Sequence, residues 1–177
     1  MRFKHLMPVC LVALAALQTA GADALRPITH EDIWTLGRVG TPVIAPDGRH
    51  AVVGVTEPSY EDEGDISDLW LITVDGSQPP RRLTATKSGE SDVAWRPDGG
   101  AIAFSAKRGD DEVAQIFVLD MSGPGEAVRI TDLSTGGKKP AWSPDGSRIA
   151  FESRVYPGAL DDEANAAEKE AREERKY

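Results

Sequence analysis

The sequence contains very little cysteine and few aromatic residues. Cys10 is the only cysteine among 177 residues, and Phe, Trp and Tyr together make up 6%. A chain with one cysteine cannot form an internal disulfide, so a folded domain must be held by its hydrophobic core. Acidic residues outnumber basic residues, which gives the chain a formal net charge of −9. That balance argues against a nucleic-acid-binding surface, which needs clustered Lys and Arg.

Motifs of common catalytic and metal sites are missing as well. His30-Glu31 is not followed by a second histidine four residues after His30, so the zinc motif H-E-x-x-H is absent. No G-x-S-x-G nucleophile motif occurs. We therefore predict no catalytic residue, no metal ligand and no cofactor in this chain. The acidic segment 57–68 does not match a calcium-loop motif, so a solvated loop is the default interpretation, with a looser calcium site as the alternative.

Long hydrophobic runs are confined to the first 22 residues. A positive start (Arg2, Lys4) precedes an apolar run over 6–17, and Ala20-Gly21-Ala22 has the form of a small-residue cleavage site. This pattern predicts a signal peptide cleaved after Ala22 and a periplasmic or secreted protein. The run is shorter than the roughly 20 residues of a membrane-spanning helix, which disfavours a retained anchor.

A Pro-Asp-Gly turn occurs three times, with its proline at Pro46, Pro97 and Pro144. The second interval is 47 residues, and Trp70 with Phe117 stand at the same spacing. In such a turn, proline presets the backbone, aspartate accepts a local hydrogen bond, and glycine takes the left-handed conformation that closes it. A turn that recurs at a constant period indicates one structural unit repeated along the chain.

Each repeat carries about four short strand patterns in roughly 47 residues, the length of a β-propeller blade. Trp95 and Trp142 precede their turn prolines by two residues, where the first repeat has Ile44. We predict that they pack between neighbouring blades rather than stack on a ligand. The structural repeat residues are Pro46, Asp47, Gly48, Trp95, Pro97, Asp98, Gly99, Trp142, Pro144, Asp145 and Gly146.

The fold class expected is therefore all-β: an incomplete propeller of about two and a half four-stranded blades. Residues 39–159 would hold the blades, with repeats near 43–84, 93–131 and 140–154. Segment 23–38 is expected to be a leader with a short helix. It starts with a capping box at Thr29, docks through Ile33 and Leu36 or Trp34, and has Gly37 as a C-cap.

The last segment, 160–177, is rich in Ala, Glu, Lys and Arg and is predicted to be a solvated helix starting near Asp161 or Asp162. Glu168/Arg172 and Lys169/Glu173 have the i,i+4 spacing of ion pairs. The chain is expected to end within its third blade, and open strand edges of that kind favour association with further strands. The pair Arg81-Arg82 is interpreted as an ion-paired or solvated strand face rather than a phosphate site.

The runs Arg82-Leu83-Thr84…Trp95-Arg96-Pro97-Asp98-Gly99 and Arg129-Ile130-Thr131…Trp142-Ser143-Pro144-Asp145-Gly146 resemble the propeller repeats of two groups. One is the periplasmic propeller protein of the Tol system. The other is the N-terminal propeller of the prolyl oligopeptidase family, in its bacterial dipeptidyl aminopeptidase and acylaminoacyl peptidase branch. The leader 28–33, the strand 115–119 and the charged insertion with Val155-Tyr156-Pro157 favour the peptidases.

The resemblance implies an exported serine peptidase whose Ser, Asp and His lie on a C-terminal α/β-hydrolase domain, which is absent from this sequence. In that family the propeller covers the active site and filters substrates by size. We therefore expect a non-catalytic, substrate-gating segment that is inactive alone. Its partners would be a peptide substrate, through the hydrolase domain, and the missing blades, but neither nucleic acid nor, after signal cleavage, membrane. The alternative is a non-catalytic periplasmic binding or scaffold propeller of the Tol type.

Overall fold

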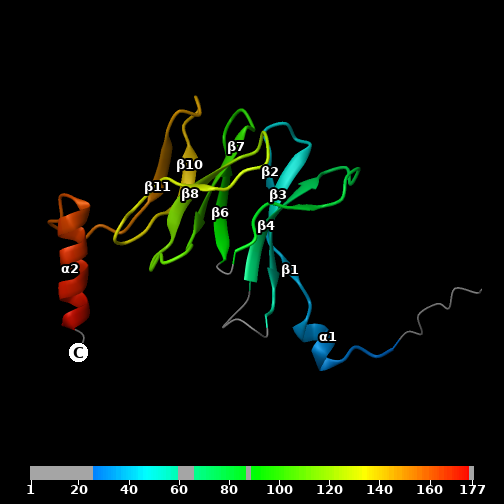
Figure 1. Ribbon diagram of the computed structural model, residues 1–177, viewed down its shortest axis with the longest axis horizontal. Coiled ribbons are helices and arrows are strands. Elements are labelled where there is room, and N and C mark those ends of the chain that lie inside the picture. Colours follow the sequence, from blue (N-terminus) through cyan, green and yellow to red (C-terminus); the bar gives the residue numbers. More distant parts are fainter. Residues whose placement is uncertain (1–25, 60–65, 87–88, 176–177) are drawn as a thin grey trace, which may run out of the picture.

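The computed structural model describes residues 26–59, 66–86 and 89–175, and its strands form three antiparallel sheets that stand side by side (Figure 1). The signal-peptide prediction lies outside these residues, as does the stretch 60–65 of the acidic loop. Sheet A comprises β1 (Arg38–Val39), β2 (Val43–Ile44), β3 (His50–Glu57), β4 (Ile66–Thr73) and β5 (Arg81–Arg82). Sheet B comprises β6 (Glu90–Trp95), β7 (Ala101–Ala106), β8 (Gln115–Asp120) and β9 (Val128–Arg129). Sheet C comprises β10 (Lys138–Trp142) and β11 (Ile149–Glu152).

The Pro-Asp-Gly turns join β2 to β3, β6 to β7 and β10 to β11, and all three lie at the same end of the sheets, at the top of Figure 1. Gly48, Gly99 and Gly146 have φ of 67°, 75° and 69°, the left-handed region that the turn requires. The registers agree as well, because Trp95 opposes Ile102 in sheet B and Trp142 opposes Ile149 in sheet C. The predicted repeat is therefore a repeat of backbone geometry.

A β-bulge interrupts the first strand of sheets B and C at equivalent positions. The register shifts between Ser91 and Ala94 in β6, and between Lys138 and Ala141 in β10. Asp92 and Lys139, which stand 47 residues apart, have φ of 56° and 48°. The bulges touch, because the Lys139 amide donates to a carboxylate oxygen of Asp92 at 3.2 Å. Sequence reasoning did not predict this feature, since neither residue is a glycine.

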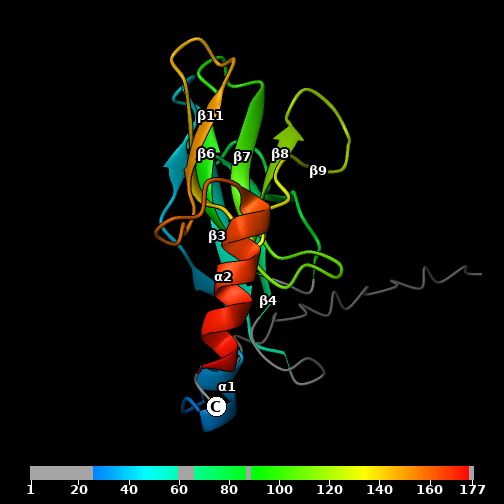
Figure 2. The same cartoon turned by 90° about the vertical axis from the view of Figure 1, so that its left-hand side faces the viewer.

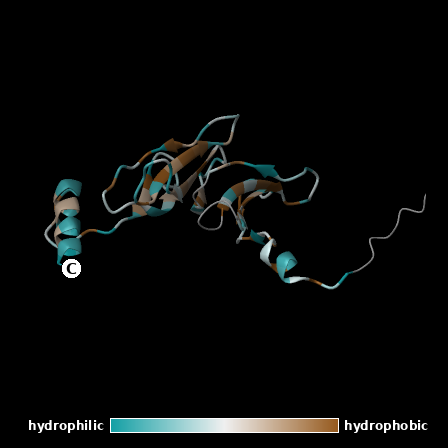
Figure 3. Ribbon diagram, turned by 60° about the horizontal axis from the view of Figure 1, so that its bottom comes forward, coloured by the Kyte–Doolittle hydropathy of each residue, from teal (hydrophilic) through white to brown (hydrophobic). Residues whose placement is uncertain are grey.

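The main core lies between sheets A and B, where each sheet presents one apolar face to the other. Val52 and Leu69 on sheet A are both 1% exposed. Ile102 and Phe104 on sheet B are completely buried, and the Phe104 ring stacks on Phe117 with centroids 6.1 Å apart. Burial of each such side chain contributes about 1.5–3 kcal/mol. Figure 3 shows the hydrophobic residues gathered in these sheets.

Helix α1 (His30–Trp34) has the predicted start. The Asp32 amide donates to the Thr29 hydroxyl at 3.3 Å, and the Thr29 amide donates to the Asp32 carboxylate at 2.7 Å, which completes the capping box. Arg26 pairs with the same carboxylate at 2.5 Å. These local hydrogen bonds and the ion pair hold the helix together.

The predicted docking of α1 is wrong. Ile33 and Leu36 are 61% and 62% exposed, and Trp34 is 50% exposed. The C-cap is Thr35 in a right-handed conformation rather than Gly37. A helix of five residues presents little surface to bury, and Figure 1 shows α1 beyond the end of sheet A rather than against its face.

Helix α2 (Asp162–Glu174) begins at the position expected from the sequence, with Asp161 as N-cap. Figure 1 shows it beside sheet C rather than on it, and Figure 2, seen from that side, shows its axis running roughly along the strand direction. Within this helix, Asn165 is the one buried residue, so it is attached by polar groups and not by an apolar stripe. Glu168 pairs with Arg172 at 2.7 Å as predicted, whereas the Lys169 ammonium donates to the Ser134 carbonyl at 3.2 Å.

Candidate functional site

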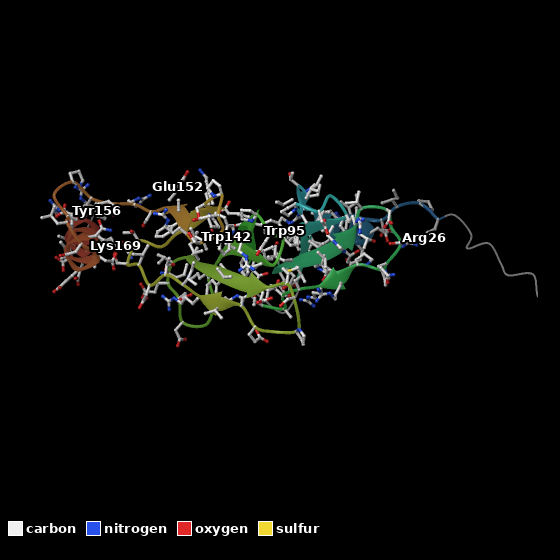
Figure 4. The ribbon with its side chains drawn as sticks, turned by 90° about the horizontal axis from the view of Figure 1, so that it is seen from above. Arg26, Trp95, Trp142, Glu152, Tyr156 and Lys169 are labelled. Carbon is white, nitrogen blue, oxygen red and sulfur yellow. The ribbon has the colours of Figure 1, made fainter. Side chains whose placement is uncertain are left out.

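The repeat tryptophans lie at the junctions between sheets. The Trp95 indole N–H donates to the Val43 carbonyl of sheet A at 2.9 Å (Figure 4). The Trp142 indole N–H donates to the Ala94 carbonyl of sheet B at 3.1 Å. Both acceptors stand three residues before a turn proline, so one contact is made twice. Ile44, which takes this place in sheet A, is 62% exposed.

The turns themselves also meet, glycine against proline. A Cβ added to Gly146 would lie 3.1 Å from Cγ of Arg96 and 3.7 Å from Cδ of Pro97. A Cβ added to Gly99 would lie 4.0 Å from Cδ of Pro46. Glycine at the second junction therefore serves both the left-handed turn and the close approach of the neighbouring turn. The Arg96 guanidinium completes this contact, 5.9 Å from the Trp142 ring centroid.

Buried charged groups join sheets A and B at the strand ends opposite the Pro-Asp-Gly turns. Glu90, whose side chain is fully buried, accepts a hydrogen bond from the Thr84 hydroxyl and pairs with Arg108 at 2.5 Å. The Arg108 guanidinium also lies over the Phe104 and Phe117 rings, 5.2 and 5.0 Å from their centroids. Its charge is therefore balanced by one carboxylate in an apolar setting.

A second buried carboxylate, Asp68, sits beside this group and pairs with Arg82. The expected ion-paired strand face of Arg81-Arg82 is thus present, through Arg82. The equivalent arginine in sheet B, Arg129, pairs with Asp111 at 3.0 Å. The carboxylates of Asp68 and Asp111 therefore hold strands together rather than bind a ligand.

The junction between sheets B and C replaces these charges with neutral groups. Gln115 stands 47 residues after Asp68 and accepts from the Thr131 hydroxyl at 2.7 Å. In both sheets the threonine two residues after the arginine accepts from an amide of the preceding strand: the Leu69 amide of β4 donates to Thr84, and the Ile116 amide of β8 donates to Thr131, both at 2.9 Å. Sequence reasoning matched these segments without assigning the threonines a role. The repeat spacing of 47 was the signal that could have found it.

Local hydrogen bonds lower the pKa of the turn aspartates. The Ser143 hydroxyl, followed by the Ser147 amide, lowers the pKa of Asp145 to about 2. The pKa of Asp98 is also lowered, chiefly by the Arg96 side chain. Asp47 follows the same rule, with the Arg49 amide as the main cause of its lowered pKa. Within the described ranges, no group of three or more His, Cys, Asp or Glu gathers as a metal site would require.

Comparison with known proteins gives the chemical context of these blades. No family model matches the chain. It is 32% identical over 105 residues to Dipeptidyl-peptidase 5 of Porphyromonas gingivalis, an overlap of 59% of this chain and 15% of that protein. It is 33% identical over 85 residues to the uncharacterized peptidase YuxL of Bacillus subtilis, an overlap of 48% and 13%. By sequence, the chain is similar to a segment of two peptidases. The chain thus spans a small part of the length of these peptidases.

Solved structures confirm the fold. The β-propeller domain of the Trilobed protease from Pyrococcus furiosus matches 73% of this chain and 40% of its own length, with a TM-score of 0.54 and 16% identity. TolB from Acinetobacter baumannii matches 68% of this chain and 27% of its own length, with a TM-score of 0.51 and 25% identity. The expected all-β propeller fold is therefore confirmed, and the two peptidase relatives support the resemblance to peptidases. Neither described helix is long and apolar enough to cross a membrane.

Proposed function

We propose that this chain is the substrate-gating propeller segment of an exported serine peptidase. The observation that carries the proposal is the 32% identity to Dipeptidyl-peptidase 5 over 105 residues, in a chain whose strands form sheets of propeller type. The repeat prolines, glycines and tryptophans would then have an architectural role, setting the distance between blades. Buried Glu90, which accepts from the Thr84 hydroxyl after β5 and is held by Arg108, would fix the first junction, so that the blades form a stiff wall beside the chemistry of another domain.

A chimera tests this function. The 105 matched residues of Dipeptidyl-peptidase 5 are replaced by those of this chain, and cleavage of a dipeptidyl chromophore is compared with cleavage of longer peptides. We expect the chimera to cleave the small substrate and to show an altered limit on peptide length, because a gate changes access and not bond cleavage. A folded chimera with an unchanged length limit would reject the gating role. Turnover by this chain alone, lost on inhibition of a serine nucleophile, would reject the non-catalytic assignment.

A binding or scaffold propeller of the Tol type is the second candidate. It is favoured by the 25% identity to TolB, which is higher than the 16% identity to the Trilobed protease propeller. The chimera separates the two candidates, since a scaffold propeller has no reason to support peptidase activity. A chimera that folds but has lost cleavage of every peptide would favour the scaffold.

Export and domain boundaries form part of the proposal. We propose a signal peptide over 1–22, a leader over 23–38, blades over 39–159 and a helical insertion over 160–177. N-terminal sequencing of the protein recovered from the periplasm or medium should begin at Asp23. Recovery of a chain that still begins at Met1, from the cytoplasm, would overturn the export assignment.

A further inference from the structure

A hollow of about 640 Å³ lies between sheets B and C, at the edge opposite the Pro-Asp-Gly turns. Its walls come from the end of β7, the loop before β8, the start of β10 and the segment after β11. This volume is within the range of small-ligand pockets. The blades are therefore not fully sealed against each other at this edge.

Three basic side chains line the hollow without an acidic partner. Lys107, Lys138 and Arg154 are exposed, and no ion pair joins any of them to another residue of the described ranges. Two carboxylates also line the hollow: Lys139 binds that of Glu152 at 3.0 Å, and Glu112 stands on the loop before β8. The contrast with the other junction is informative, because Arg82 and Arg108 each have a carboxylate there.

The backbone that carries Arg154 is held by a buried amide. Asn165 of α2, 4% exposed, donates to the Arg154 carbonyl at 2.9 Å and to the Thr135 hydroxyl at 3.2 Å. It also accepts from the Tyr156 amide at 2.8 Å. Figure 4 shows Tyr156 close to the helix that carries Lys169. The polar docking of α2 thus fixes two walls of the hollow, the Thr135 loop and the Arg154 segment.

We propose that this hollow binds a peptide carboxylate, either a free C-terminus or an acidic side chain, through Lys138 and Arg154 with Lys107 at its margin. Arg154 and Lys138, which form no ion pair with a described residue, supply the charge-assisted hydrogen bonds that a carboxylate accepts, and with Lys107 they outnumber the carboxylates of Glu112 and Glu152. The chain has a net charge of −9, so its surface as a whole repels anions. A cluster of basic side chains attracts anions locally. The choice of a peptide carboxylate over other anions rests on the proposed peptidase context.

Isothermal titration of the whole chain tests the site, with trialanine as the free acid, trialanine amide and inorganic phosphate as probes. We expect the acid to bind and the amide to bind at least about tenfold more weakly, because the attraction is to the negative charge. Binding should weaken as salt rises, because the side chains are exposed. Equal binding of acid and amide would overturn the proposal. Phosphate binding as strongly as trialanine would overturn the peptide assignment.

Matched variants locate the binding. Lys138→Gln and Arg154→Gln should each weaken binding of the acid about threefold or more, whereas Arg148→Gln should not. Arg148 is an exposed arginine at the Pro-Asp-Gly end of β11, so its variant removes the same charge far from the hollow. An equal loss in all three variants would show a general charge effect and reject the site. Asn165→Ala should also weaken binding while the Trp fluorescence of the sheets stays unchanged. The result is independent of the chimera, so a failed carboxylate site and a failed gate can be told apart.

Discussion

Removing the Glu90 carboxylate should strongly destabilise the junction between sheets A and B. In Glu90→Ala, the Arg108 guanidinium keeps its place over the Phe104 and Phe117 rings but loses the carboxylate 2.5 Å away. The Nε atom of Arg108 is already buried without a hydrogen-bond partner, so no spare acceptor can replace Glu90. Breaking a buried ion pair on one side typically costs about 3–5 kcal/mol. That is a large part of the roughly 5–15 kcal/mol that holds a domain together.

The assay is urea unfolding at low protein concentration, followed by tryptophan fluorescence. The midpoint should fall with an unchanged slope, since the slope reports the surface exposed on unfolding. Arg108→Met tests the reasoning, because an apolar chain in that place needs no carboxylate. In this background Glu90→Ala should cost much less, with a coupling of about 1–3 kcal/mol. Equal costs in the two backgrounds would refute the buried-pair account. Glu152→Ala is the control: its pair with Lys139 is exposed and is worth about 0–1 kcal/mol.

Three further predictions concern the repeats. Trp142→Phe should lower stability by about 1 kcal/mol in the same urea assay, because it removes the hydrogen bond to the Ala94 carbonyl and keeps most of the ring; no change would mean that the bond has no net value. Lys139→Gly should be neutral or stabilising by up to about 1 kcal/mol, since it relieves a φ of 48° and loses only an exposed ion pair; a marked loss would show that the side chain holds the bulge. The pKa of Asp145 is lowered to about 2, so its contribution is present above pH 4 and is lost as pH falls from about 4 to about 2. Acid unfolding of Asp145→Asn should be less steep in that interval than that of the native chain, and identical acid curves would contradict it.

The features that the sequence predicts well are those decided by a few neighbouring residues. The left-handed glycines, the aspartate hydrogen bonds of the turns and the capping box at Thr29 follow from local chemistry, and all are present. The spacing of 47 adds long-range information, because it places Trp95 and Trp142 in equivalent positions. Composition alone could not predict which residue of one sheet contacts which residue of the next sheet.

The missed features depend on such partners. The bulges at Asp92 and Lys139 arise from strand pairing and carry no glycine to mark them. The expected burial of Ile33 required a surface for α1, and the five-residue helix lies beyond sheet A. The attachment of α2 through Asn165 was not visible in a segment whose apolar residues are nearly all alanine. A polar contact of this kind leaves no hydrophobic period in the sequence.

The two junctions differ in chemistry, and this difference helps to determine which sheet packs against which during folding. Three near-identical hairpins could in principle stack in the wrong succession, as repeated units in one chain often do. If sheet C settled on sheet A, Gly137 would stand where Glu90 belongs, and the Thr84 hydroxyl would meet no carboxylate. The contact of Thr84 with Glu90 therefore identifies sheet B as the proper neighbour of sheet A, whereas Thr131 bonds to Gln115 of its own sheet and needs no acid from sheet C. Small changes between copies of a duplicated unit would in this way prevent the copies from exchanging places.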